Sequence, residues 1–132
     1  MKRLLLASLL ASLPAVAGPY DQVYSLITTD KSRAADHEIL PVIVNRVDGE
    51  TVMSRTEAVV APGVRKVTID LPARRGFSQA TQHTFDLDAK PCTRYYLAAK
   101  LDSVTTQTWT PIVRKSEPIG ECAAKFKVAG AK

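Results

Sequence analysis

Short stretches in which apolar and polar residues alternate constrain the fold of this chain more than any other feature. Residues 65–71 alternate, with Val67, Ile69 and Leu71 facing one way, and residues 81–87 repeat the pattern. Alternation with a period of two places one set of side chains on a single face of a strand, which can then cover a core. Helical periodicity is almost absent. The sequence therefore predicts an all-β protein.

Further strands are expected at residues 39–47, 93–101 and 107–114, and Thr51–Met53 and Glu57–Ala61 can continue the series. Turn residues separate them, most clearly at Asp48-Gly49, a strong hairpin signal, and at Pro62-Gly63. Pro41 and Pro111 indicate strand edges or bulges, because proline donates no ladder hydrogen bond. Six to seven short strands predict an antiparallel β-sandwich of immunoglobulin-like or transthyretin-like type over residues 39–132.

Residues 18–38 give a weaker pattern. A short apolar patch at Val23, Leu26 and Ile27 has helical spacing, and the stretch becomes polar from Thr28 to Asp36. One or two helical turns and an early edge strand both fit the patch. We therefore expect a partly irregular N-terminal segment whose secondary structure the pattern leaves open.

Residues 1–17 have the features of a signal peptide. Lys2 and Arg3 precede an apolar run over residues 4–13, and Ala15 and Ala17 are the small residues that a signal peptidase requires, so cleavage is expected before Gly18. No second apolar stretch follows, and no cysteine follows the cleavage site to accept a lipid anchor. The expected location is periplasmic or secreted, with no membrane span or lipid anchor.

The chain has two cysteines, Cys92 and Cys122. In an oxidising compartment an even pair is expected to form a disulfide. Its formation would close a loop of about 30 residues and stabilise a small domain by roughly 3–4 kcal/mol in the chain-entropy treatment. The sequence thus predicts one structural disulfide.

The charge balance excludes one class of partner. The formal net charge is +5, and removal of Lys2 and Arg3 with residues 1–17 leaves 16 basic against 13 acidic side chains, a net charge of +3. Nucleic-acid binding requires a basic stripe with stacking aromatic residues, whereas these basic residues are scattered among acids. No nucleic-acid partner is expected.

Three short motifs resemble those of a known group of domains. They are Val47-Asp48-Gly49, the Ala61-Pro62-Gly63 turn that leads into residues 67–69, and the Tyr95-Tyr96 pair of a late strand. Their order over residues 39–101 is similar to small exported bacterial β-sandwich domains of the DUF2846 or PEGA-like type, a family of unknown function. The resemblance implies a non-enzymatic binding or assembly module.

Patterns typical of catalysis are missing from the sequence. Asp36, His37 and Glu38 are adjacent, so in an extended chain they point to opposite sides and do not converge on a metal. Neither a Gly-x-Ser-x-Gly elbow nor a glycine-rich phosphate loop occurs. A hydrolase built on His83 with Asp86 or Asp88 is the least favoured alternative. We expect no catalytic residues, no cofactor and no metal.

A binding role is the main expectation, with another cell-envelope protein as the partner. Candidate contact residues are the aromatic side chains Tyr95, Tyr96 and Trp109 and the loop pair Arg74 and Arg75. Tyr95 and Tyr96 face opposite sides of a strand, so one belongs to the core and the other to the surface. An exposed edge strand, or the loops Asp48–Arg55 and Pro72–Ala80, would make the contacts. The alternative is a small-molecule or glycan-binding protein.

Overall fold

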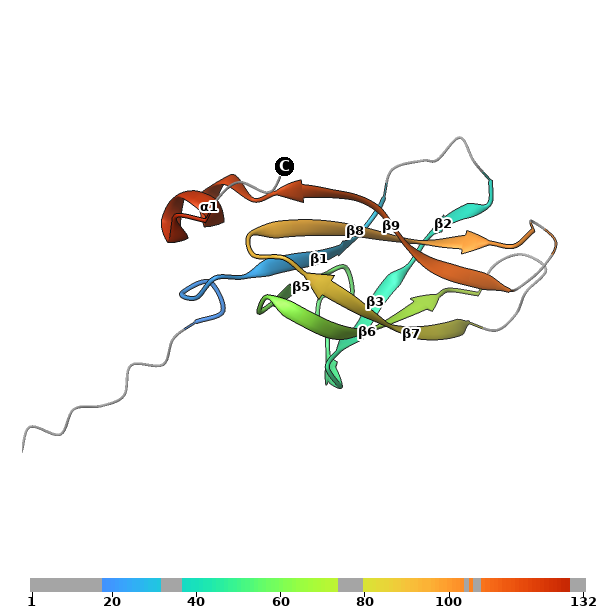
Figure 1. Cartoon of the computed structure of the whole chain (residues 1–132). Coiled ribbons are helices and arrows are strands. Elements are labelled where there is room, and N and C mark those ends of the chain that lie inside the picture. The colour runs from blue at the N-terminus through green and yellow to red at the C-terminus, as the bar shows by residue number, and fades with distance from the viewer. Residues whose placement is uncertain (1–17, 32–36, 74–79, 104, 106–107, 129–132) are drawn as a thin grey trace, which may run out of the picture.

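The computed structural model describes residues 18–31, 37–73, 80–103, 105 and 108–128, which form two facing β-sheets with a short helix at one end (Figure 1). The all-β sandwich expected from the sequence is confirmed. The described residues contain nine strands rather than six or seven, because residues 39–47 form two strands instead of one and residues 25–29 form a further strand. The elements are β1 Ser25–Thr29, β2 Ile39–Pro41, β3 Ile43–Val47, β4 Glu50–Thr51, β5 Glu57–Val60, β6 Gly63–Leu71, β7 Thr81–Ala89, β8 Thr93–Leu101, β9 Trp109–Pro118 and α1 Gly120–Phe126.

The first sheet is built around β8. One side of β8 pairs antiparallel with β9. The other side pairs in parallel with β1 and, further along β8, antiparallel with β2. β5 continues the sheet by pairing antiparallel with β1. The N-terminal patch is therefore a strand, and it lies inside the sheet between β8 and β5 rather than at an edge.

The second sheet has the order β4-β3-β6-β7 and is antiparallel throughout. The alternation expected for β6 is confirmed, since Val67, Ile69 and Leu71 are buried in the core. Thr68 points to the opposite face but is also buried, and its hydroxyl lies 2.9 Å from that of Thr84 on β7. Hydrogen-bonded polar pairs thus cover the outer face of this sheet.

The core lies between the sheets. Its fully buried members include Ile27, Val44, Ile69, Leu97 and Trp109, so both sheets contribute. Both prolines expected at edges are found on edge strands. Pro41 ends β2 just before the chain crosses from the first sheet to β3 of the second, and Pro111 lies on β9, whose one described ladder is with β8.

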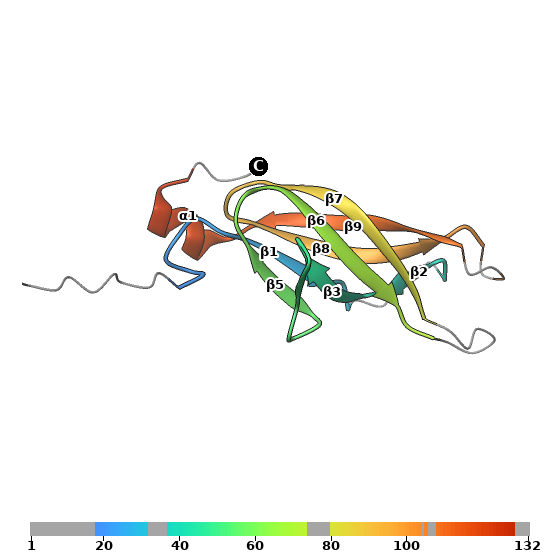
Figure 2. The same cartoon turned by 90° about the horizontal axis from the view of Figure 1, so that it is seen from below.

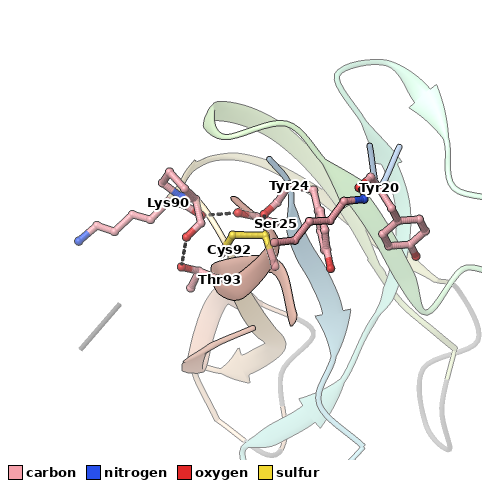
Figure 3. The surroundings of a disulfide bond; sticks show 9 residues. Tyr20, Tyr24, Ser25, Lys90, Cys92 and Thr93 are labelled. Carbon is pink, nitrogen blue, oxygen red and sulfur yellow. Dashed lines mark hydrogen bonds between the residues drawn. A yellow bond between two sulfur atoms is a disulfide. The ribbon is translucent and has the colours of Figure 1, made fainter. Parts of the chain in front are cut away.

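The predicted disulfide between Cys92 and Cys122 is present, with an S–S distance of 2.02 Å. It ties the start of β8 to α1, and Figure 3 shows it beside Tyr24 and Ser25 of the N-terminal stretch. Both cysteines belong to a small second hydrophobic cluster with Tyr24, Leu26 and Ile119. The cluster attaches the helix to the outer face of the first sheet.

The helix α1 was not expected from the sequence. It has seven residues and no side-chain N-cap, and so short a helix is not stable by itself in water. Burial of Cys122 holds it in place. None of the helical structure in the described ranges is long or apolar enough to span a membrane.

Candidate functional site

A groove of about 570 Å³ opens beside β5, at the edge of the sandwich where the chain passes from the second sheet to the first. One wall is formed by Val47, Asp48 and residues 50–54, and the other by residues 57–61 together with Arg65. The connection between β4 and β5 projects from the body of the sandwich next to β5 (Figure 2). The loop Asp48–Arg55, which the sequence singled out, therefore forms most of one wall.

The β3–β4 hairpin is held in position by Asp48. Asp48 and Gly49 both have positive φ values, 51° and 82°, as a tight two-residue hairpin turn of type I′ requires. The Asp48 carboxylate accepts a hydrogen bond from the Lys66 backbone N–H at 2.9 Å and contacts Arg65 Nη1 at 3.0 Å. The turn is thereby fixed to the beginning of β6.

These contacts predict how Asp48 titrates. The hydrogen bond from the Lys66 N–H, followed by that from the Arg65 guanidinium, holds the pKa of the Asp48 carboxyl below its ordinary value. A group with a lowered folded-state pKa stabilises the fold above its unfolded-state pKa and loses that contribution as pH falls through the folded-state value. Carbonyl-detected NMR titration should find the midpoint below 3.8. Arg65→Gln should raise it, and a wild-type midpoint at or above the ordinary value would contradict the assignment.

β5 is an edge strand, and the direction of its backbone groups follows from its register with β1. Thr29 N–H donates to Thr56 O at 3.0 Å, and Ile27 lies opposite Ala58 two residues further along. Because hydrogen-bonded pairs alternate along an antiparallel ladder, Ala58 and Val60 point their N–H and C=O groups toward β1. Glu57 and Val59 direct theirs away from β1, toward the groove.

The two ends of this edge already have partners. Ser54 Oγ accepts the Glu57 N–H at 3.1 Å and donates to Glu57 O at 2.7 Å. At the other end Arg65 Nε donates to Ala61 O at 2.9 Å. Between them the backbone groups of Val59 face the groove and have no partner among the described residues. The edge is thus open only in its middle.

The side chains around the opening are a mixture of apolar and acidic groups. Met53 is 90% exposed at the tip of the connection, whereas Val52 packs against the core. Val59 is half-buried on the outer face of β5, and Glu50 and Glu57 are exposed. An extended peptide is recognised through such a combination, in which the strand edge supplies main-chain hydrogen bonds and the side chains select the sequence.

Of the aromatic residues singled out in the sequence, Tyr95 and Trp109 belong to the core. The Tyr95 hydroxyl accepts the Lys90 N–H at 2.8 Å and donates to Asp88 O at 3.3 Å, so it fastens the β7–β8 turn. Trp109 Nε1 donates to Thr81 Oγ1 at 2.7 Å. Neither ring is available on the surface.

Tyr96 is the half-buried member of the tyrosine pair, as the alternation along the strand predicts. Its hydroxyl donates to Glu117 Oε1 at 2.6 Å, and Lys115 Nζ lies 4.5 Å from the centre of its ring. The hydrogen bond from Tyr96 lowers the pKa of Glu117. Tyr96 is thus part of an ion network on the outer face of the first sheet.

Other candidates from the sequence are not brought together. Arg74 and Arg75 lie outside the described residues, as does most of the loop Pro72–Ala80. His37 and His83 are both exposed, and the ring of His83 packs edge-to-face on Trp109 with centroids 4.3 Å apart. Within the described ranges no three His, Cys, Asp or Glu side chains gather in an arrangement suited to a metal ion.

The sequence predicted a strand at residues 57–61 but did not reveal that the edge of β5 is open. The alternation of Ala58 and Val60 with Glu57 and Val59 indicates which side chains face the core. It does not show which backbone N–H and C=O groups of β5 are hydrogen-bonded to a neighbouring strand, because that depends on the register with β1.

No family model, curated protein or solved structure matches this chain. Roles for individual residues therefore come from the geometry alone. The three motifs that led us to expect a DUF2846 or PEGA-like domain lie at the β3–β4 turn, at the turn before β6 and within β8. All three are elements of the sandwich framework, and the first lies beside the groove.

Proposed function

We propose that this protein is an exported, non-catalytic module that binds an extended segment of another cell-envelope protein along β5. The observation that carries the proposal is the open middle of this edge strand, where the backbone of Val59 faces a groove with apolar and acidic walls. Addition of a strand to a sheet edge supplies main-chain hydrogen bonds without requiring a deep pocket. Exposed edges also promote aggregation, and the contacts of Ser54 and Arg65 shorten the accessible part of this one.

Export is supported by two independent features. Residues 1–17 have the charged, apolar and small-residue regions of a signal peptide. The Cys92–Cys122 disulfide is of a kind that persists in oxidising compartments. The Gly18 backbone N–H donates to Asp21 Oδ2 at 2.7 Å. A chain processed before Gly18 would retain all the strands found among the described residues.

Replacement of Val59 by proline tests the proposal. Proline removes the N–H that faces the groove, and it leaves intact the ladder to β1, which Ala58 and Val60 maintain. A photo-crosslinking side chain in place of Met53 should capture a discrete envelope protein, and Val59→Pro should abolish that product. Mass spectrometry of the crosslinked band identifies the partner and the residues attached.

Two controls make the test specific. Val59→Ala shortens the side chain but keeps the N–H, so the crosslink should persist. The same photo-crosslinker in place of Asp86, an exposed residue of β7 in the other sheet, should not give the product. A Met53 crosslink that survives Val59→Pro in a folded variant would contradict strand addition at β5.

The volume of the groove also permits a second function. About 570 Å³ lies within the range of small-molecule sites, so a small ligand or a glycan is the alternative occupant. A ligand of this kind needs no backbone hydrogen bonds from Val59. Thermal-shift screening of envelope glycans and metabolites against wild type and Val59→Pro separates the two functions, because a small ligand would stabilise both proteins.

A further inference from the structure

The groove differs in charge from the rest of the chain. Its walls contain the carboxylates of Asp48, Glu50 and Glu57 and a single described cation, Arg65. Arg65 is bound to Asp48 at 3.0 Å, so two carboxylates remain in excess. The chain as a whole carries a formal net charge of +5. The candidate site is therefore an acidic patch on a basic protein.

Glu57 is placed to contact a partner strand directly. It is exposed and lies on the same face of β5 as Val59, two residues away. Arg94 of the same sheet interacts with Glu57 electrostatically, and it contacts Glu117 Oε1 at 3.4 Å. Because Ser54 occupies the backbone groups of Glu57, a strand added to β5 pairs its main chain with Val59. Its residue two positions along then lies beside the Glu57 side chain on the same face.

We propose that the groove selects an extended partner segment in which a lysine or arginine and an apolar residue are two positions apart. This inference rests on the proposed function and specifies its partner. The basic residue lies beside the Glu57 side chain, with Glu50 on the facing wall adding to the attraction, and the apolar residue lies against Val59. Opposite charges on directly paired residues stabilise a strand pair, whereas like charges destabilise it.

The same charges act against self-association through this edge. Two copies joined antiparallel through β5 would bring both Glu57 side chains and both Glu50 side chains into one interface. Neither copy has a free basic residue on β5 to offset them, since the strand reads Glu-Ala-Val-Val. A basic segment of a different protein therefore complements the charge of the groove better than a second copy does.

The test is a selection from a phage-displayed library of random peptides about ten residues long. Wild-type protein processed at Gly18 is the target, and Val59→Pro is used to remove binders that do not need the strand edge. The expected result is enrichment of peptides with a basic residue and an apolar residue two positions apart. Synthetic versions should bind Glu57→Lys about two- to tenfold more weakly than wild type, and added salt should weaken binding to wild type.

Matched variants and peptides separate the outcomes. Asp86→Lys makes the same charge change on β7 and should leave affinity unchanged. N-methylation of alternate peptide amides blocks strand addition without changing the protein, so the test remains valid if Val59→Pro is poorly folded. Enriched peptides that require the strand edge but show no basic bias would overturn this inference and leave the proposed function in place. Failure to enrich any peptide sensitive to N-methylation would overturn the proposed function itself.

Discussion

Replacement of Trp109 by alanine is expected to lower the free energy of unfolding by about 3–5 kcal/mol, the range for truncation of large buried aromatic residues. Trp109 is 2% exposed. It begins β9 of the first sheet, and its indole N–H donates to Thr81 Oγ1, on β7 of the second sheet, at 2.7 Å. The substitution leaves a cavity, breaks this link between the sheets and uncovers the ring of His83, which packs on the indole.

Urea unfolding followed by circular dichroism measures this loss, since the tryptophan needed for fluorescence is absent from the variant. Small domains have total stabilities of about 5–15 kcal/mol, so the variant should lose a large part of its stability. Met53→Ala is the matched control. Met53 is 90% exposed, and its truncation should change stability by no more than about 0.5 kcal/mol. A loss below about 1 kcal/mol for Trp109→Ala would contradict the packing described for the core.

Removal of the disulfide is expected to have the second large effect. Cys92 and Cys122 are 30 residues apart in the sequence, and opening such a loop increases the entropy of the unfolded chain by an amount worth about 3–4 kcal/mol. The double variant Cys92→Ser and Cys122→Ser should therefore unfold at a much lower urea concentration than wild type. The slope of the unfolding transition should change as well, because the uncrosslinked unfolded chain exposes more surface.

Hydrogen exchange locates the effect of that change. Cys122 anchors α1 over Tyr24 and Leu26, so the amides of α1 should lose protection first. The amides of β6 and β7 should still exchange only on global unfolding, at the lowered stability of the variant. Reduction of the wild-type protein should reproduce the behaviour of the double variant. Equal urea midpoints for oxidised and reduced wild type would show that the crosslink does not support the fold.

Much of the framework could be predicted from the sequence because it depends on local patterns. The alternation of Val67, Ile69 and Leu71 depends only on the strand period, and the burial of these residues confirms it. The Asp48-Gly49 turn follows from the φ values that these residue types tolerate. The Cys92–Cys122 bridge was expected because the chain offers no other pairing.

The remaining features depend on contacts between distant parts of the chain. Leu26 and Ile27 form a strand inside the first sheet because β8 and β5 flank them, and nothing in their local spacing indicates this. The short helix α1 depends on the disulfide for its position. The groove requires the relative placement of the β3–β4 hairpin, β5 and Arg65, so no local motif marks it.

The pairing of β1 with β8 also determines when the protein can fold. β1 lies near the beginning of the chain, and its parallel partner is the penultimate strand, with Leu26 opposite Arg94. During synthesis or translocation from the N-terminus, β1 can pair with β8 only after most of the chain has emerged. Until then β5 is the only one of its two partner strands that is available. Closure of the first sheet is therefore a late event, and a chain that stops before β8 keeps β1 as an unsatisfied edge.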